Sequence, residues 1–442
     1  MNCVHVLPSL RELERSFADE LVVVGVHSGK FIAERETENI RQAVLRLGIE
    51  HPVLNDRQYR TWRAYAVNAW PTLVLVDPAG YVVGQHAGEF TAERLAPAIR
   101  RVVAEAEARG TLDRRALTFP AEPLPATPLA FPQKLALDGR GAHLALADTG
   151  HHRVLLLHLD ADARAAEVMA VAGSGEGGLR DGPLEDARFR RLHGVAFSGE
   201  RVLVADTDNH ALREIDLGAG EVRTLAGTGE QARRWPPRGG PAREVALNSP
   251  WDVLEHEGVV YVAMAGCHQV WRMLPGSGRI EPWLGSGAEA LHDGSAASAA
   301  LAQPSGLATD GVRLYFADSE SSAIRWAELA DGQTGTIVGT GLFDFGDRDG
   351  VGQQARLQHP LGVALHGTEL LVADTYNDAL KRIDPRTRTA TTWLSGDAGV
   401  LHEPGGIAVA GGRAFVADSN HQRVLVAEPA DGAHWELSIR GL

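Results

Sequence analysis

The sequence predicts an α/β domain at the N-terminus, followed by an all-β propeller of six blades. Residues 1–109 alternate amphipathic helical stretches with short apolar strands. Residues 129–442 repeat a four-strand pattern six times, and the segment 110–128 between them is rich in proline. A chain of 442 residues is longer than one hydrophobic core normally serves, so two domains joined by a linker are expected.

The first domain reads as helix, strand, helix, hairpin and helix. Apolar residues at helical spacing mark the helices, and continuous apolar runs mark the strands. The turn sequence Asp77-Pro78-Ala79-Gly80 joins the two strands of the hairpin. The expected elements are helices at 7–17, about 35–47 and about 59–67, and strands at 21–27, 70–76 and 81–85.

A single cysteine lies at the start of this domain. Four motifs in this part of the chain are specific in order and spacing: Asn2-Cys3-x-His5-x-Leu7-Pro8, Gly25-Val26-His27-Ser28, His51-Pro52-Val53-Leu54-Asn55-Asp56 and Ala69-Trp70-Pro71-Thr72. Through these motifs, residues 1–109 resemble the thioredoxin-like domain of the proteins that fuse thioredoxin to NHL repeats. That family's motif runs Cys-Cys-Ile-Asn-Cys, so the resemblance aligns Cys3 with the last, resolving cysteine. The nucleophilic cysteine and the strand before it would then lie upstream of Met1.

The first core strand of the domain is missing from this sequence. It would lie in the middle of the sheet, between the strand at 21–27 and the strand that starts at Thr72. Four or five buried aliphatic side chains in such a strand sum to about 10 kcal/mol, which is comparable to the net stability of a domain. Two interpretations remain: the natural protein begins further upstream, which we favour, or the domain is degenerate and fills the gap in another way.

The Trp70-Pro71 bond is expected to be cis. In thioredoxin folds, the proline before the third core strand lies against the active-site cysteine and leaves the neighbouring backbone free to pair with an extended peptide. The resemblance therefore implies that Trp70, Pro71 and Thr72 form a substrate-binding cis-proline loop, with Cys3 as the catalytic residue. The alternative is a trans proline that starts an edge strand.

The repeat in residues 129–442 has a clear marker. A strand that ends in Ala-Asp is followed by a polar turn, and Ala263-Met264 takes this place in the third unit. Four short antiparallel strands per unit, repeated six times, predict a six-bladed β-propeller. The units resemble NHL repeats through residues 205–216 and 373–384. The markers in the other five units are Ala147-Asp148, Ala205-Asp206, Ala317-Asp318, Ala373-Asp374 and Ala417-Asp418.

The repeated polar residues are interpreted as structural. The aspartates can accept hydrogen bonds from the backbone of the following turn, where Asn209 and Asn377 tolerate left-handed geometry. His152, His210 and His268 occupy matching turns, but blades fan apart and zinc ligands must converge on one ion. The Asp-Gly pairs could hold calcium, yet Asp-Gly is first a turn dipeptide. We expect no metal and no cofactor. The pairs are Asp181-Gly182, Asp293-Gly294 and Asp349-Gly350.

One connection between repeats differs in charge. Residues 233–243 form a basic, Trp-containing insert in an acidic protein, with Arg233, Arg234, Trp235 and Arg238 as the candidate partner loop. A simple solvated loop is the alternative. Cys267 lies in the turn of the third unit, where it is expected to be exposed enough to oxidise and to have no catalytic role.

Composition narrows the function classes. The net charge of -14 argues against nucleic acid, because phosphate binding requires clustered Lys and Arg. No apolar run reaches 18 residues, so the sequence predicts no membrane-spanning helix. No basic region followed by an apolar run marks a signal peptide. Two cysteines give no disulfide framework, which favours a reducing compartment and a cytoplasmic location.

Three functions are compatible with these observations. By family resemblance, the protein is a thiol-disulfide oxidoreductase in which an upstream thiolate attacks a protein client and Cys3 resolves the mixed disulfide. The chain as given, with one thiol in this domain, is expected to be inactive in turnover. The second function is a non-catalytic scaffold that binds a protein or peptide through a propeller rim and the cis-proline loop. The third is a propeller hydrolase or lyase with an ion near the central channel.

Overall fold

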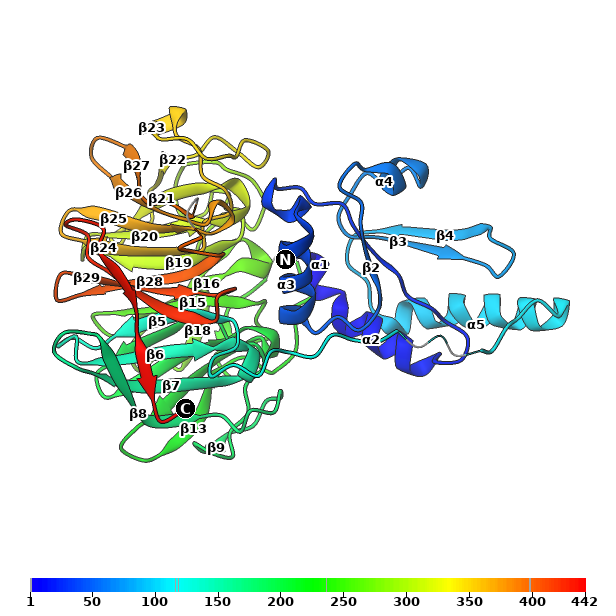
Figure 1. Cartoon of the computed structure of the whole chain (residues 1–442), viewed down its shortest axis with the longest axis horizontal. Coiled ribbons are helices and arrows are strands. Elements are labelled where there is room, and N and C mark those ends of the chain that lie inside the picture. The colour runs from blue at the N-terminus through cyan, green and yellow to red at the C-terminus, as the bar shows by residue number, and fades with distance from the viewer. Residues whose placement is uncertain (1, 116, 118, 236, 397–398) are drawn as a thin grey trace. The chain divides into compact units, whose positions relative to one another are not determined.

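The structure of the chain is a computed structural model. It describes residues 2–115, 117, 119–235, 237–396 and 399–442. The chain divides into two compact units, Met1–Pro125 and Ala126–Leu442. Figure 1 follows both units along the chain from the blue N-terminus to the red C-terminus. Each unit is described by itself below.

The first unit has the predicted order of helices and strands, with two short helices, Asn2–His5 and Ala33–Arg35, and one strand in addition. The sequence did not predict the three-residue strand at Val53–Asn55, which is too short to show an apolar pattern. The elements are α1 (Asn2–His5), α2 (Leu7–Ser16), β1 (Gly25–His27), η1 (Ala33–Arg35), α3 (Thr37–Leu47), β2 (Val53–Asn55), α4 (Arg60–Ala64), β3 (Thr72–Val76), β4 (Val82–Ala87) and α5 (Ala92–Arg109).

Local sequence explains where the longer helices of this unit begin and end. Thr91 precedes α5 and its hydroxyl accepts a hydrogen bond from the N–H of Arg94. Gly110 and Gly48 end α5 and α3 in the left-handed conformation, with φ of 67° and 58°. A buried hydrophobic cluster of this unit consists of Leu13, Phe17, Ala92 and Ile99, with partly buried neighbours packed around them.

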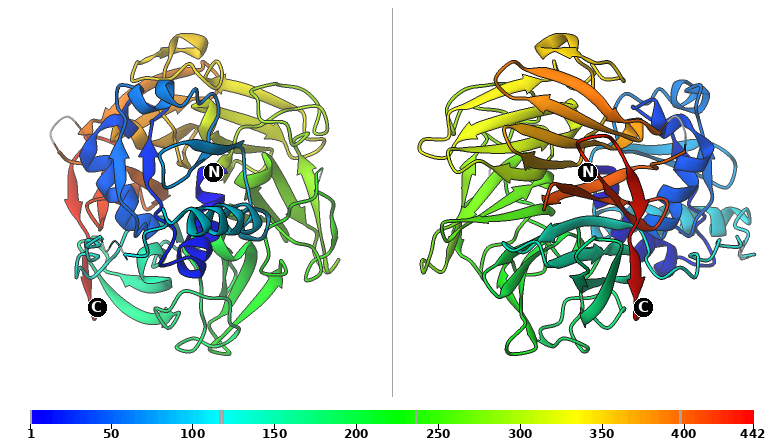
Figure 2. Two further views of the ribbon diagram at one scale, coloured as in Figure 1. Left: turned by 90° about the vertical axis from the view of Figure 1, so that its right-hand side faces the viewer. Right: turned by 60° about the vertical axis from the view of Figure 1, so that its left-hand side comes forward.

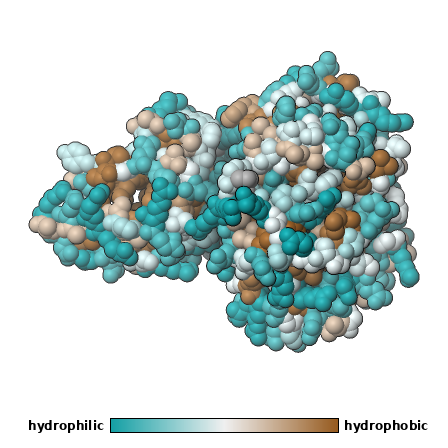
Figure 3. All heavy atoms as spheres, turned by 180° about the vertical axis from the view of Figure 1, so that it is seen from behind, coloured by the Kyte–Doolittle hydropathy of each residue, from teal (hydrophilic) through white to brown (hydrophobic). Residues whose placement is uncertain are grey.

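The strands of the first unit form two separate sheets. β1 pairs in parallel with β2, and β3 pairs antiparallel with β4, and among the described residues no pairing joins the two sheets. The central strand of the sheet is thus absent from the described structure. Apolar side chains near the gap are at the surface. Val22, Val24 and Val26 are 47%, 56% and 43% exposed. Figure 3 shows brown apolar side chains on the outside of this unit.

The second unit is a six-bladed propeller, as predicted. Each blade is a sheet whose four main strands are antiparallel and follow one another along the chain, and Figure 2 shows the blades around the ring. The blades are β5 (Pro132–Leu137), β6 (His143–Asp148), β7 (Arg153–Leu159) and β8 (Ala165–Ala172); β10 (Val195–Ser198), β11 (Arg201–Asp206), β12 (Ala211–Asp216) and β13 (Glu221–Ala226); β15 (Pro250–His256), β16 (Val259–Met264), β17 (Gln269–Met273) and β18 (Arg279–Leu284); β19 (Pro304–Thr309), β20 (Arg313–Asp318), β21 (Ala323–Glu328) and β22 (Thr334–Val338); β24 (Gly362–His366), β25 (Glu369–Asp374), β26 (Ala379–Asp384) and β27 (Thr389–Leu394); and β28 (Pro404–Ala410), β29 (Arg413–Asp418), β30 (Arg423–Ala427) and β31 (His434–Glu436).

Four blades carry a short fifth strand. In blades two, three and five it comes from the preceding connection and pairs antiparallel with the fourth strand. In blade one it comes from the other end of the chain, where β32 pairs in parallel with β8 and closes the ring. The indole N–H of Trp435 also donates to the carbonyl of Ala163 at 2.7 Å. These fifth strands are β9 (Gly182–Pro183), β14 (Gly240–Pro241), β23 (Gly350–Val351) and β32 (Ser438–Arg440).

Candidate functional site

Cys3 lies on α1 and is exposed, and it forms no disulfide in the described structure. Two residues further on, His5 Nδ1 lies 2.7 Å from Glu89 Oε1. The neighbour of Glu89, Gly88, donates its N–H to the carbonyl of Pro71 at 2.8 Å. A short series of contacts therefore ties the helix that carries Cys3 to the proline loop.

The Trp70-Pro71 bond is cis, which confirms the prediction. The loop around it is held in place by the Trp70 indole, whose N–H donates to the carbonyl of Ser28 at 2.9 Å. The Trp70 ring lies 4.5 Å from the ring of Trp62, and the residue remains 38% exposed. Thr72 closes the turn on its own side, since its hydroxyl donates to the carbonyl of Ala69 at 2.7 Å. The loop thus combines a fixed backbone with a partly open aromatic surface.

A buried carboxylate, Asp56, holds the residue to which the Trp70 indole is bonded. Asp56 accepts a hydrogen bond from the Ser28 hydroxyl at 3.0 Å and three more from backbone N–H groups at the start of α4. Burial alone would raise the pKa of Asp56, but these hydrogen bonds outweigh it and hold the pKa below its usual value. Asp56 therefore joins the loop after β1 to α4, which carries Trp62.

The sequence pointed to Cys3, Trp70, Pro71 and Thr72 but gave no role to Ser28, Asp56 or Trp62. Ser28 and Asp56 stood at the ends of two of the motifs that carried the family resemblance. A buried Ser–Asp pair brought together from residues 28 apart in the chain has no local sequence signal. Their part in the site is visible only in the fold.

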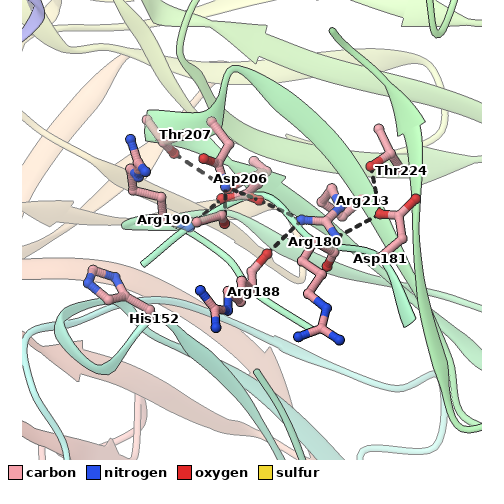
Figure 4. Close-up of polar contacts among 12 residues, drawn as sticks. His152, Arg180, Asp181, Arg188, Arg190, Asp206, Thr207, Arg213 and Thr224 are labelled. Atoms are coloured by element: carbon pink, nitrogen blue, oxygen red, sulfur yellow. Dashed lines mark hydrogen bonds and ion pairs between the residues drawn. The ribbon is translucent and has the colours of Figure 1, made fainter. Parts of the chain in front are cut away.

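The second unit contains a repeated ion-pair network, shown for blade two in Figure 4. Arg213 on β12 is fully buried and donates to Asp206 Oδ2 and to Asp181 Oδ1, both at 2.8 Å. The Thr224 hydroxyl donates to the same Asp181 oxygen at 2.8 Å. Asp206 also accepts from the N–H of Arg190 at 2.8 Å. One arginine thus links two strands to the connection that leads into the blade.

Blade four repeats this network, and blade five repeats the part of it around the Asp-Gly carboxylate. Arg325 donates to Asp318 and Asp293, both at 2.9 Å, and Thr336 donates to Asp293 at 2.7 Å. In blade five, Lys381 donates to Asp349 at 3.2 Å, and Thr392 donates to Asp349 at 2.8 Å. The three Asp-Gly pairs of the sequence therefore supply carboxylates to cationic side chains of the protein itself.

Burial and pairing shift the pKa of the strand-end aspartates in opposite directions. Burial raises the pKa of Asp206 to about 6 and that of Asp374 to about 7, against the lowering effect of the hydrogen bonds and cations around them. In blades one and six the cation is nearer in the sequence. Asp148 accepts from Arg153 at 2.7 Å, and Asp418 accepts from Arg423 at 2.8 Å. All five aspartates thus have a structural role.

The hydrogen-bond partner predicted for these aspartates was wrong. The backbone N–H that each aspartate binds precedes the first strand of its own blade, and from the turn that follows it contacts a side chain instead of the backbone. The aspartates are Asp148, Asp206, Asp318, Asp374 and Asp418, and their turn partners are His151, Asn209, Ser321, Asn377 and His421. The left-handed residue of the turn was also predicted one position early. It is the residue after Asn209 or Asn377, and its φ is 48° at His210 and 50° at Asp378.

Blade three replaces the whole network by apolar or neutral residues. Met264 stands where the other blades have aspartate, and Trp271 stands in the position of Arg213. Pro282 pairs with Trp271 as Thr224 pairs with Arg213, and Gly239 precedes β14 as Asp181 precedes β9. Met264 and Trp271 lie together in a hydrophobic cluster. Four changes in one blade thus remove a buried ion pair and all of its partners together.

The turn histidines connect neighbouring blades. His152 Nδ1 accepts a hydrogen bond from the N–H of Arg191 at 3.1 Å, and His210 Nδ1 accepts from Ser249 at 3.0 Å. Ser322 and Asp378 accept in the same way further around the ring. Among the residues that the structure describes, no group of three or more His, Cys, Asp or Glu side chains could hold a metal ion.

Acid is expected to weaken the contact made by His152. Burial lowers the pKa of His152 below 6.5, and the nearby Arg191 and Arg190 add to this effect while Asp208 opposes it. The unfolded chain takes up the proton first, so the stabilisation is complete above about pH 6.5 and is lost as the pH falls below that value. Urea unfolding measures the free energy of unfolding at pH 7.5 and at pH 5.5. The decrease between these two pH values should be smaller for His152→Asn than for the natural sequence. An equal loss in both proteins would contradict this role.

The remaining candidate residues of this unit differ in exposure. Cys267 is only 2% exposed, and burial raises the pKa of its thiol to about 12, so the prediction that it is open to oxidation was wrong. The candidate partner loop is at the surface, where Arg233, Arg234, Trp235 and Arg238 are all exposed. No helix among the described residues is long and apolar enough to cross a membrane.

Comparison with known proteins decides the family. Residues 1–82 match the family described as thioredoxin-like. NHL repeat-containing protein 2 of Bos taurus is 36% identical in an alignment that covers 97% of this chain and 65% of that protein. The chain belongs to the thioredoxin-like/NHL-repeat family. A second member, Protein SUPPRESSOR OF QUENCHING 1, chloroplastic, of Arabidopsis thaliana, is 39% identical and covers 99% of this chain and 44% of its own length.

The chain therefore spans less than two thirds of either relative. Solved structures are more distant from this family member. A chain of a nidogen/laminin complex covers 66% of the present chain and 91% of its own length, with 13% identity and a TM-score of 0.45. Virginiamycin B lyase from Staphylococcus aureus covers 71% of the present chain and 86% of its own length, with 11% identity and a TM-score of 0.42.

Proposed function

We propose that the thioredoxin-like unit performs thiol-disulfide exchange on a protein client, with Cys3 as the resolving thiol and the propeller as the client-binding unit. The observation that supports this proposal is the connection between α1 and the proline loop. The helix with the exposed Cys3 is tied through His5 and Glu89 to the segment that holds cis-Pro71. Disulfide exchange requires an exposed thiol, and a loop tied to the helix that carries this thiol can position the client chain.

The proposed reaction has two exchanges. A nucleophilic thiolate outside residues 2–442 attacks the client disulfide, forms a mixed disulfide and releases one client thiolate. The Cys3 thiolate then attacks the sulfur of that nucleophile, which releases the second client thiolate and leaves a disulfide that an external dithiol reduces. Trp70 and the backbone beside Pro71 position the client chain in both steps.

The chain as given is expected to perform only part of this reaction. With the isolated 442-residue protein, dithiothreitol-driven reduction of insulin should be no faster than with a Cys3→Ser variant, because one thiol cannot release its own mixed disulfide. Incubation with an aromatic disulfide should label Cys3 and leave the buried Cys267 unlabelled in the folded protein.

Mass mapping of the labelled peptides checks this prediction, and labelling in urea is the control for Cys267. A Cys3-dependent insulin rate in this chain would contradict the assignment of Cys3 as a resolving thiol only. Failure of Cys3 to form any mixed disulfide would contradict its place in the reaction.

We also propose a reducing compartment, with the cytoplasm as the first candidate, since neither cysteine forms a disulfide in the described structure.

A further inference from the structure

The connection between blades two and three lacks an ion pair that three other connections make with the blade that follows them. In the connections into blades two, four and five, Asp181, Asp293 and Asp349 bind the cation on the third strand of the next blade. In the connection into blade three, Gly239 stands at the matching place, and the third strand carries Trp271. The segment before Gly239 therefore lacks the ion pair that fixes its counterparts.

This segment is also strongly basic. Residues 231–243 contain four arginines and no carboxylate, in a chain with a net charge of -14. Arg233, Arg234 and Arg238 are exposed and make no ion pair or hydrogen bond with any other residue that the structure describes. Several other arginines on the propeller surface have carboxylate partners. Examples are Arg188 with Glu176, Arg272 with Glu281, Arg313 with Glu328 and Arg356 with Asp344.

The aromatic residue of the segment is held in place although it is exposed. Trp235 is 57% exposed, and its six-membered ring rests on Gly287 of the next connection. A Cβ at Gly287 would come within 2.7 Å of Trp235 Cζ2, so the indole lies where only glycine leaves room. A seated indole with an open face, flanked by unpaired guanidinium groups, has the composition of a binding hot spot.

We propose that residues 231–235 and 237–243 form a docking site for an acidic stretch of polypeptide. Guanidinium groups pair with carboxylates through two parallel hydrogen bonds, and three of them lie within six residues here. The open face of Trp235 would take an apolar or aromatic side chain between the partner's carboxylates. A nucleic acid fits less well, because the chain's overall negative charge repels a long phosphate backbone.

Fluorescence anisotropy with the full chain tests this proposal. The probe is a fluorescein-labelled 12-residue peptide with six glutamates and two phenylalanines, and the comparison peptide has glutamine in place of each glutamate. A labelled single-stranded RNA of 20 nucleotides is the third probe. We expect the glutamate peptide to bind more tightly than the other two and to weaken as salt increases. Equal binding of the two peptides, or tighter binding of the RNA, would overturn the proposal.

Matched variants assign the binding to this segment. Arg234→Glu should weaken binding of the glutamate peptide about tenfold, whereas Arg140→Glu, an exposed arginine in the turn between β5 and β6, should have little effect. Trp235→Ala should weaken binding to a similar degree. Leu179→Ala is its control, since Leu179 also contacts a glycine of the next connection, Gly229, and is also exposed. Equal effects of test and control variants would place the binding elsewhere on the protein.

Discussion

Replacing Asp206 by alanine is expected to lower the free energy of unfolding by about 3–5 kcal/mol, because it leaves the fully buried Arg213 with only part of its compensation. The backbone N–H of Arg190 also loses its acceptor. Chemical denaturation of the propeller, followed by tryptophan fluorescence, measures the change. A loss below about 1 kcal/mol would show that Asp206 is not essential to the blade.

The informative comparison is a double substitution. Blade three shows that this protein tolerates an apolar pair in the same position, since Met264 and Trp271 replace the aspartate and the arginine there. Asp206→Met combined with Arg213→Met should therefore cost less than either single change, because no buried charge remains unpaired. A double variant as unstable as the sum of the two single variants would contradict the ion-pair interpretation.

The second large effect concerns the missing strand of the thioredoxin-like unit. Fusing a five-residue apolar strand before Asn2 should raise the free energy of unfolding of this unit by about 3 kcal/mol. Burial of its side chains contributes about 10 kcal/mol, and the entropy lost in ordering five residues costs about 7 kcal/mol of this. The strand would also cover Val24 and Val26, which are exposed now. Hydrogen exchange of their amides, compared with a glycine-serine extension of the same length, provides the test.

No gain in stability and no protection of these amides would favour the degenerate domain that the sequence left open. In that case the two small sheets, β1 with β2 and β3 with β4, would be the finished architecture of the unit. The glycine-serine control separates the effect of the strand from that of added length alone.

The sequence predicted most of the fold because the fold depends on local patterns. The five Ala-Asp markers and Ala263-Met264 gave the blade number, and the family motif around Trp70 gave the cis bond. The strand β2 was missed because three residues carry no periodic signal. Its partner β1 was predicted longer than it is, since Val22 and Val24 have strand-like composition but no neighbouring strand among the described residues.

The ion-pair networks were missed because their members lie far apart in the chain. Asp181 and Arg213 are separated by 32 residues, and Asp349 and Lys381 by the same number. A signal was nevertheless present within the one sequence. Blades two, four and five have both an Asp-Gly pair and a cation at the same position of the third strand, and blade three lacks the pair and has Trp271 at that position. Comparing the blades position by position would have revealed the network and its absence from blade three.

The most direct test of the proposed function is insulin reduction by a chain extended with the strand and with a cysteine that completes a Cys-x-x-Cys pair with Cys3. The proposal predicts turnover with dithiothreitol that disappears in the same extended chain carrying Cys3→Ser, with a trapped mixed disulfide in its place. Turnover that survives loss of Cys3, or an extended and stable chain with both cysteines that reduces no insulin, would contradict the assignment of Cys3 as the resolving thiol.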